Sequence, residues 1–165
     1  MKDDRYTDFT FSAIGTIRSP FDDLENMPIQ PPGAKKIKGR VEVFDEFAAG
    51  LTDISGFSFI TLIYAFHLSK NYSLIIKPFL DDVTHGIFAT RYPKRPNQIG
   101  MSVVRLKKVE GNVLHIEGVD VVDGTPLLDI KPYVPKFDSR RTKRIGWFIK
   151  NVNRVASIRS DGRLK

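Results

Sequence analysis

The residues of this sequence that could do chemistry gather in three stretches, and the first is a stiff loop over residues 27–33. Its residues are Met-Pro-Ile-Gln-Pro-Pro-Gly. Prolines fix φ, so this loop loses little entropy when a ligand orders it. Gln30 offers an amide that both donates and accepts hydrogen bonds, which suits an adenine edge or an amino-acid headgroup. The alternative is a stiff surface loop that binds nothing.

The second stretch, residues 89–100, places three cations, a tyrosine and an asparagine around two prolines. The cations are Arg91, Lys94 and Arg95. Arginine forms bidentate hydrogen bonds with carboxylates and phosphates, and its guanidinium stacks on bases. The pattern therefore predicts an anion or nucleotide site on a rigid loop. The alternative is a turn that carries charged side chains on the surface.

The third stretch, residues 118–133, sets Asp120, Asp129 and Lys131 among apolar residues. A carboxylate stabilises a cationic ligand by direct charge pairing, so this stretch predicts a site for a cation. The Asp-Gly pair at 123–124 suits a tight turn between strands. The alternative is a hairpin turn with one surface ion pair.

Composition and motifs exclude several classes of site. The chain has 165 residues and no cysteine, which excludes disulfides, a thiolate nucleophile and cysteine-bound zinc or iron–sulfur centres. Its three histidines are scattered, so we expect no metal site, and His67, after an apolar run, is more simply a hydrogen-bonded histidine. The sequence contains no dinucleotide fingerprint, P-loop or nucleophile elbow. Its most apolar run, residues 57–66, is half of the ~20 residues that a membrane-spanning helix needs, and the N-terminus is acidic, which together predict a cytoplasmic protein.

Periodicity predicts the short strands that must position these stretches. Apolar residues alternate with polar ones, or β-branched and aromatic residues cluster, in residues 9–17, 39–44, 57–67, 101–109 and 112–122. The last two strands flank Glu110-Gly111-Asn112, a hairpin turn, and residues 45–54 form the one helix expected in this part. Many short strands without βαβ alternation predict a mainly β protein, a compact, β-barrel-like single domain with few short helices and a C-terminal helical tail.

The net charge of +7 comes entirely from the C-terminal end of the chain. Residues 136–165 carry ten basic and two acidic residues, a net charge of +8, and the other residues carry −1. Such a concentration of cations favours a polyanion such as RNA as partner, the alternative being a solvated face. Apolar residues three or four positions apart predict a helix over about 143–157, followed by a frayed end at 157–165. We therefore predict a barrel domain, 1–138, and a basic helical tail, 139–165.

Five segments of the chain, in this order, resemble the TrmO/YaeB family of tRNA methyltransferases. They are IGTIRSPF (14–21), PIQPPG (28–33), GRVEVFDEFAAGLTDISGFSFI (39–60), GIFATRYPKRPNQIGMSVVRL (86–106) and DVVDGTPLLDIKPYVP (120–135). The resemblance implies a β-barrel-like fold, S-adenosylmethionine as cofactor, and methylation of N6 of threonylcarbamoyl-adenosine next to the tRNA anticodon. It also implies a homodimer with the cofactor near the subunit interface. The chain departs from the family at YPKRPNQ, where a small residue before the first proline and a final PNP are common.

The resemblance also implies roles for individual residues. Those expected to bind the cofactor are Pro28, Ile29, Gln30, Phe66, His67, Arg91, Met101, Glu117, Gly118, Val119 and Asp120. Their charge, independently of the resemblance, marks six cations as expected RNA contacts: Lys94, Arg95, Arg140, Arg141, Lys143 and Arg144. The chemistry of the transfer adds Asp123, Lys131 and Tyr133 as candidates for a catalytic proton acceptor, and none of them is assigned as the general base.

Two other functions stay open at this point. One is an enzyme of the same fold and cofactor that methylates a different acceptor. This alternative arises because bacterial members carry an extra C-terminal domain. In this chain, the basic tail would replace that domain in tRNA binding. The other is an RNA-binding module without catalysis, which the charged tail alone would explain. If the tail serves RNA only, removing residues 140–165 reduces tRNA affinity and spares cofactor binding.

Overall fold

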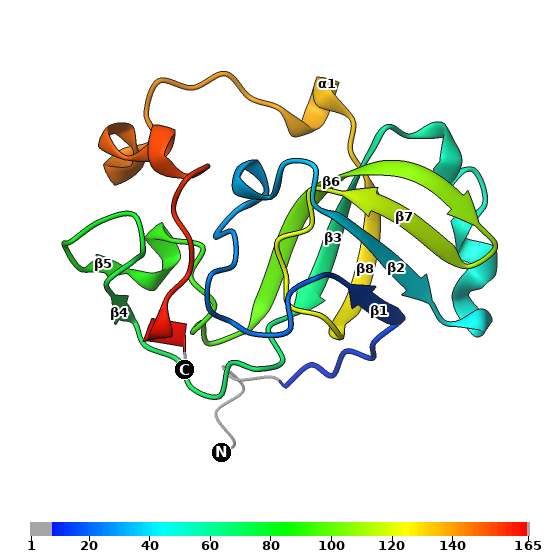
Figure 1. Ribbon diagram of the computed structural model, residues 1–165, viewed down its shortest axis with the longest axis horizontal. Helices are drawn as coiled ribbons and strands as arrows, with labels where there is room; N and C mark the ends of the chain where they lie inside the picture. The colour runs from blue at the N-terminus through cyan, green and yellow to red at the C-terminus, as the bar shows by residue number, and fades with distance from the viewer. Residues whose placement is uncertain (1–7, 165) are drawn as a thin grey trace, which may run out of the picture.

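Six antiparallel strands close into a barrel in the computed structural model, which describes residues 8–164 (Figure 1). The order of strands around the barrel is β1-β2-β7-β6-β3-β8. Their bounds are β1 Gly15–Arg18, β2 Lys38–Val43, β3 Phe59–Ala65, β6 Ile99–Glu110, β7 Val113–Glu117 and β8 Thr125–Pro132. The barrel confirms the predicted mainly β fold. The parts of the predicted domain and tail at residues 1–7 and 165 lie outside the described residues.

The barrel interior is filled by every second side chain of its strands. In β3, Ile60, Leu62 and Tyr64 are buried while their neighbours are only partly so. In β2, Val41 and Val43 are buried, whereas the alternate residues are exposed or partly buried. Successive side chains of a strand point to opposite faces, so alternation in the sequence becomes an inside and an outside of the barrel. This packed interior is the main hydrophobic core.

The helices are short, and most are 3-10 helices. The one α-helix described among residues 8–164 is α1, Pro135–Asp138, just after β8. The 3-10 helices are η1 Pro31–Ala34, η2 Asp45–Leu51, η3 Ile54–Gly56, η4 Ile87–Ala89, η5 Gly146–Lys150, η6 Val152–Arg154 and η7 Gly162–Leu164. The helix predicted at 45–54 is therefore present as the 3-10 helix η2 over Asp45–Leu51, and η3 begins only at Ile54. No helix among the described residues has the length and apolar content needed to cross a lipid bilayer.

The first predicted strand is shorter than its sequence pattern indicates. Pairing starts only at Gly15, and Phe9 and Phe11, which the pattern placed on a half-buried strand, are 77% and 67% exposed. Strand β1 lies between β2 and β8, and backbone hydrogen bonds continue only one residue further, from Ile14 N–H to the Leu127 carbonyl and from Phe44 N–H to the Ile14 carbonyl. Among residues 8–13, no strand pairing to either neighbour is present. Without a partner strand, alternation alone does not hold those residues on the barrel.

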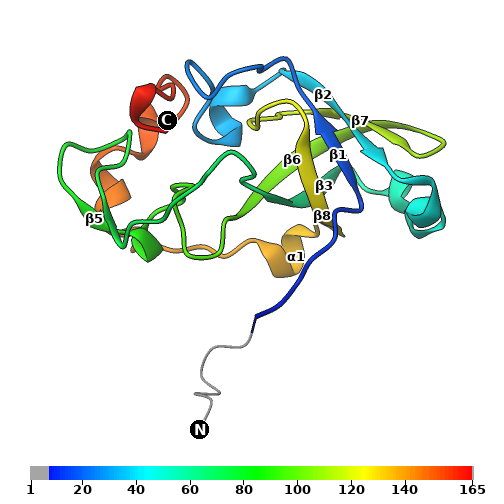
Figure 2. The ribbon, with the colours of Figure 1, turned by 90° about the horizontal axis from the view of Figure 1, so that it is seen from below.

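A small lobe lies beside the barrel. It contains the two-stranded sheet of β4 (Ile75–Ile76) and β5 (His85–Gly86) and a second, minor core around Ile87 and Tyr92. Figures 1 and 2 both show the C-terminal segment lying against this lobe and against the segment before β2, away from the β6–β7 hairpin.

The tail predicted at 143–157 is helical, but it is not the single continuous helix that the spacing indicates. Residues 146–154 form η5 and η6, two separate 3-10 turns, because Gly146 has a φ of +61° and Asn151 leaves helical geometry between them. The end predicted to fray is also held. Arg159 forms a β-bridge with Pro28, and Ser160 is 5% exposed. Of the apolar residues in the stripe, Val155 is buried and Phe148 is partly buried, whereas Ile145, Ile149 and Val152 are 37%, 64% and 43% exposed. The stripe therefore indicated neither a continuous helix nor a fully buried face.

Candidate functional site

A cavity of about 660 Å³ lies between the end of the barrel, the small lobe and the C-terminal segment. This volume lies within the range of cavities that hold small molecules and cofactors. Its wall is mostly apolar, and its ionisable lining residues are Tyr64, His67, Arg91, Tyr92 and Asp120. The described residues contain no cluster of three histidines or carboxylates that could hold a metal ion.

Two of the predicted loops meet at the cavity. Arg91, in the loop after η4, donates a hydrogen bond of 3.2 Å from Nη1 to Oε1 of Gln30, just before η1. The two residues are 61 positions apart in the chain. The arginine keeps further donors, and the amide keeps its NH₂ group, so the pair can bind a ligand with both charged and neutral polar groups.

Asp120 forms the acidic part of the cavity wall. Its Oδ1 accepts a hydrogen bond of 2.7 Å from Oγ of Ser102, which lies 3.0 Å from the hydroxyl of Tyr64. Burial raises the pKa of the Asp120 carboxyl to about 6, although the Ser102 hydrogen bond and the charge of Arg91 act in the opposite direction. A carboxylate that is costly to ionise when alone gains more from a cationic ligand than an exposed one does.

The strand register of the barrel brings this hydrogen-bonded chain together. Ser102 on β6 stands opposite Leu62 on β3, and Gly100 stands opposite Tyr64. A Cβ atom at Gly100 would lie 2.2 Å from the Tyr64 ring, so only glycine lets that ring pass close to β6. Burial raises the pKa of the Tyr64 hydroxyl, which therefore stays protonated and can donate its hydrogen bond.

The profile of the tRNA-methyltransferase O N-terminal domain family matches residues 16–139 of this sequence. The chain belongs to this family. A probable S-adenosyl-L-methionine-binding protein of Pyrococcus abyssi is 55% identical over 153 residues, which are 93% of this chain and 83% of that protein. The human tRNA (adenine(37)-N6)-methyltransferase is 34% identical over 133 residues, which are 76% of this chain and 30% of that enzyme.

The fold is also that of a solved family member. The crystal structure of TrmO from Pseudomonas aeruginosa superposes with a TM-score of 0.72 at 38% identity, over 87% of this chain and 62% of that one. The chain thus spans less than two thirds of the human enzyme and of the crystallised bacterial protein, and 83% of the archaeal relative.

Of the residues that the family resemblance links to the cofactor, most line the cavity. They are Pro28, Ile29, Gln30, Phe66, His67, Arg91 and Asp120. These come from separate stretches of the chain, before β2, after β3, after η4 and before β8. Their convergence is the main reason to regard this cavity as the functional site.

The other four predicted cofactor residues do not line the cavity of this chain. Met101 lies between inward-facing Gly100 and Ser102 on β6, so it points outward and is 51% exposed. Glu117, at the end of β7, pairs with Lys107 at 3.7 Å. Gly118 turns the chain with a φ of +93°, and Val119 is 1% exposed in the barrel core.

The three weak candidates for a proton acceptor also lie away from the cavity wall. Asp123 pairs with Arg18 at 3.4 Å and accepts a hydrogen bond from the backbone N–H of Ser19, beside a second, shallower hollow. Lys131 pairs with Asp129 at 2.8 Å. The Tyr133 ring packs edge-on against Phe59. These contacts support the interpretation of this stretch as structural at these three positions.

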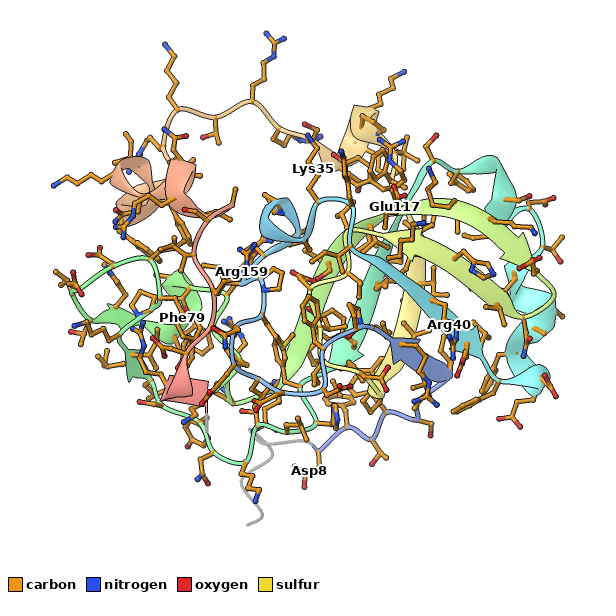
Figure 3. All side chains as sticks on the ribbon, in the orientation of Figure 1. Asp8, Lys35, Arg40, Phe79, Glu117 and Arg159 are labelled. Carbon is orange, nitrogen blue, oxygen red and sulfur yellow. The ribbon has the colours of Figure 1, made fainter. Side chains whose placement is uncertain are left out.

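The cations predicted to contact RNA occupy two different environments. Arg95 donates hydrogen bonds to the carbonyl oxygens of Ile87 and Thr90, so its guanidinium holds its own loop, and Lys94 is partly buried. The tail cations are all exposed along the connection between α1 and η5, where Figure 3 shows long side chains extending away from the barrel. They are Arg140, Arg141, Lys143 and Arg144.

Sequence reasoning missed two parts of the site. Ser102 gave no signal, because its role depends on the β3–β6 register that places it beside Tyr64 and Asp120. The C-terminal side of the cavity, which includes Trp147 and Phe148, did give a signal. The apolar stripe of the tail indicated that this segment contacts the rest of the protein, but it did not identify the cavity as the place of contact.

Proposed function

We propose that the cavity binds S-adenosylmethionine and that the protein transfers a methyl group to N6 of an adenosine in tRNA. One observation carries this proposal. Seven of the residues that the family resemblance links to the cofactor line one cavity, although they come from separate stretches of the chain. The names of the relatives support it, since they include S-adenosylmethionine-binding proteins and tRNA adenine methyltransferases.

The residues of the cavity fit this cofactor. S-adenosylmethionine carries an adenine, a cationic amine, a carboxylate and a sulfonium, and it supplies a methyl group whose transfer to nitrogen breaks the C–S bond and releases the N6 proton. The Asp120 carboxylate can pair with either cationic group, and Arg91 with the carboxylate. The apolar wall lowers the local dielectric around Asp120, which strengthens its interaction with a cationic group.

The proton released from N6 needs an acceptor near the reacting atoms. Among the described residues that line the cavity, Asp120 and His67 carry a carboxylate and an imidazole, the side-chain types that commonly act as general bases. The three candidates from the sequence, Asp123, Lys131 and Tyr133, do not line the cavity. We therefore infer that His67 or Asp120 accepts the proton, and that positioning in a closed site supplies much of the rate enhancement.

The more specific acceptor that we propose is threonylcarbamoyl-adenosine next to the anticodon. It rests on the family resemblance, and the exposed cations at residues 140–144 would contact the phosphates of the tRNA. An enzyme that acts on tRNA would work in the cytoplasm. A homodimer would explain why exposed Met101 does not line its own cavity, because a second copy could then present it. Light scattering during gel filtration tests this assembly directly.

The decisive experiment is methyl transfer from labelled S-adenosylmethionine to tRNA from cells that make the threonylcarbamoyl modification. Mass spectrometry of the nucleosides should show a gain of one methyl group on the modified adenosine. Unmodified tRNA is the matched control and should gain none. Absence of transfer, with cofactor binding intact, would instead support a different acceptor. Absence of cofactor binding would refute the proposal.

A further inference from the structure

A strap formed by residues 145–160 crosses the cavity on the side opposite the barrel. It lies beyond residues 16–139, which the family profile matches. Its side chains supply one wall of the cavity, through Ile145, Trp147, Phe148, Val152, Val155 and Ser160. The tail therefore does more than present cations to solvent.

One end of the strap is fixed to the loop that carries Gln30. The Ser160 hydroxyl donates a hydrogen bond of 2.6 Å to the carbonyl of Leu24 and accepts one of 2.9 Å from the N–H of Met27. Two backbone bonds, of 2.8 and 3.0 Å, join Ser160 to Met27 and Asn26. Figure 3 labels Arg159, which bridges to Pro28 beside this loop. Because Ser160 is buried, these bonds are shielded from water.

The other end of the strap is fixed to the loop that carries Arg91. The Trp147 indole Nε1–H donates a hydrogen bond of 2.8 Å to the carbonyl of Ala89, two residues before Arg91. The indole ring also stacks on His85, with centroids 4.5 Å apart, and on Phe148, with centroids 3.9 Å apart. This aromatic contact and hydrogen bond hold the start of the strap against the small lobe.

We propose that the strap is a positioning element of the cofactor cavity, with Trp147 and Ser160 as its two anchors. The strap ties the loop of Gln30 to the loop of Arg91, whose side chains meet at 3.2 Å. It holds both loops in the geometry that an adenosyl ligand requires, and its apolar residues exclude water from that ligand. The inference rests on the proposed function, since the ligand is S-adenosylmethionine. It replaces the expectation that residues 140–165 can be removed without loss of cofactor affinity.

The chain offers a direct probe of this inference, because Trp147 is its only tryptophan. Tryptophan emission, excited where tyrosine does not absorb, therefore reports on the strap alone. Titration of the wild-type chain with S-adenosylhomocysteine, which lacks the reactive methyl group, should change that emission with the dissociation constant that calorimetry gives. Calorimetric binding without any change in emission would overturn the inference.

Substitutions test the anchors separately. Trp147→Ala and Ser160→Ala should each weaken S-adenosylhomocysteine binding by about tenfold, a loss of the size expected when the hydrogen bonds that hold a site are removed. Trp147→Phe keeps an aromatic ring without the N–H donor and should lose about threefold. Asn153→Ala, at an exposed position of the same strap, is the matched control and should bind as the wild type does.

Thermal unfolding of each variant without ligand shows whether it is folded at the binding temperature. Trp147→Phe keeps most of the packing, so it decides the matter if Trp147→Ala fails to fold. Wild-type affinity in folded Trp147→Phe and Ser160→Ala would refute the strap while leaving the proposed function intact. No affinity in the wild-type chain would instead refute the proposed function and, with it, this inference.

Discussion

The buried carboxyl of Asp120 should make the stability of this protein depend on pH in a defined way. Its pKa is raised from 3.8 to about 6 by burial, so between these values the folded protein keeps a proton that the unfolded chain releases. The contribution of this carboxyl to the free energy of unfolding is fully present below about pH 4 and is lost as the pH rises towards 6. At about 1.4 kcal/mol for each pH unit, the loss amounts to about 3 kcal/mol.

Asp120→Asn removes this dependence, because the amide has the same shape, does not titrate and can still accept the Ser102 hydrogen bond. The free energy of unfolding of the variant minus that of the wild type should rise by about 3 kcal/mol between pH 4 and pH 7 and stay constant above. Any fixed cost of burying the amide shifts this difference equally at every pH. The test therefore uses the change of the difference with pH and not its absolute value.

Urea unfolding followed by far-ultraviolet circular dichroism from pH 4 to pH 8 measures this difference. Asp22→Asn, at an exposed position, corrects for the loss of one negative charge. Under the proposed function, S-adenosylmethionine should also stabilise the wild type more than Asp120→Asn at pH 8, because its cationic groups pair with the carboxylate. A stability difference between Asp120→Asn and the wild type that is flat across the pH range would refute the reasoning about burial.

Three further predictions follow from contacts described above. Gly100→Ala should lower the free energy of unfolding by about 2 kcal/mol, measured by urea unfolding, because the new methyl group collides with the buried Tyr64 ring. Arg91→Ala and Gln30→Ala should each weaken S-adenosylmethionine binding by about tenfold in calorimetry, and unchanged affinity in both would contradict the site. Replacing the cations at residues 140–144 by glutamine should reduce the salt dependence of tRNA binding by about 0.7 in log–log slope for each lost phosphate contact, with cofactor affinity unchanged; filter binding at several salt concentrations measures this slope.

The barrel could be predicted from the sequence where burial alternates strictly along a strand. The pattern at residues 57–67 became β3, and the Glu110-Gly111-Asn112 turn joins β6 to β7 with Gly111 at a φ of +58°. The same pattern failed at residues 9–13, because a strand also needs a hydrogen-bonded neighbour, and alternation does not reveal one. Closure of the barrel depends on pairing between distant strands such as β1 and β8, which local periodicity does not encode.

The parts of the candidate site that could be predicted are those whose residues lie close together in the sequence. The loops of Gln30 and Arg91 stand out because prolines, amides and cations are close together in the sequence. Their meeting at 3.2 Å, 61 residues apart, is a property of the fold. The strap was predicted as one helix, because apolar spacing indicates that a segment packs against the protein but does not identify its partner. The two anchors of the strap, Trp147 and Ser160, contact residues that are far away in the sequence.

The position of the strap in the chain bears on how the protein is made. All six barrel strands end by Pro132, whereas the strap occupies residues 145–160. During synthesis, which adds about 5–20 residues per second, the barrel sequence is therefore complete before the strap is translated. The loops of Gln30 and Arg91 are synthesised earlier still, before the two strap residues that contact them, Trp147 and Ser160. If the strap acts as proposed, a chain whose barrel has formed binds an adenosyl ligand at full affinity only once Ser160 has reached the loop at Met27.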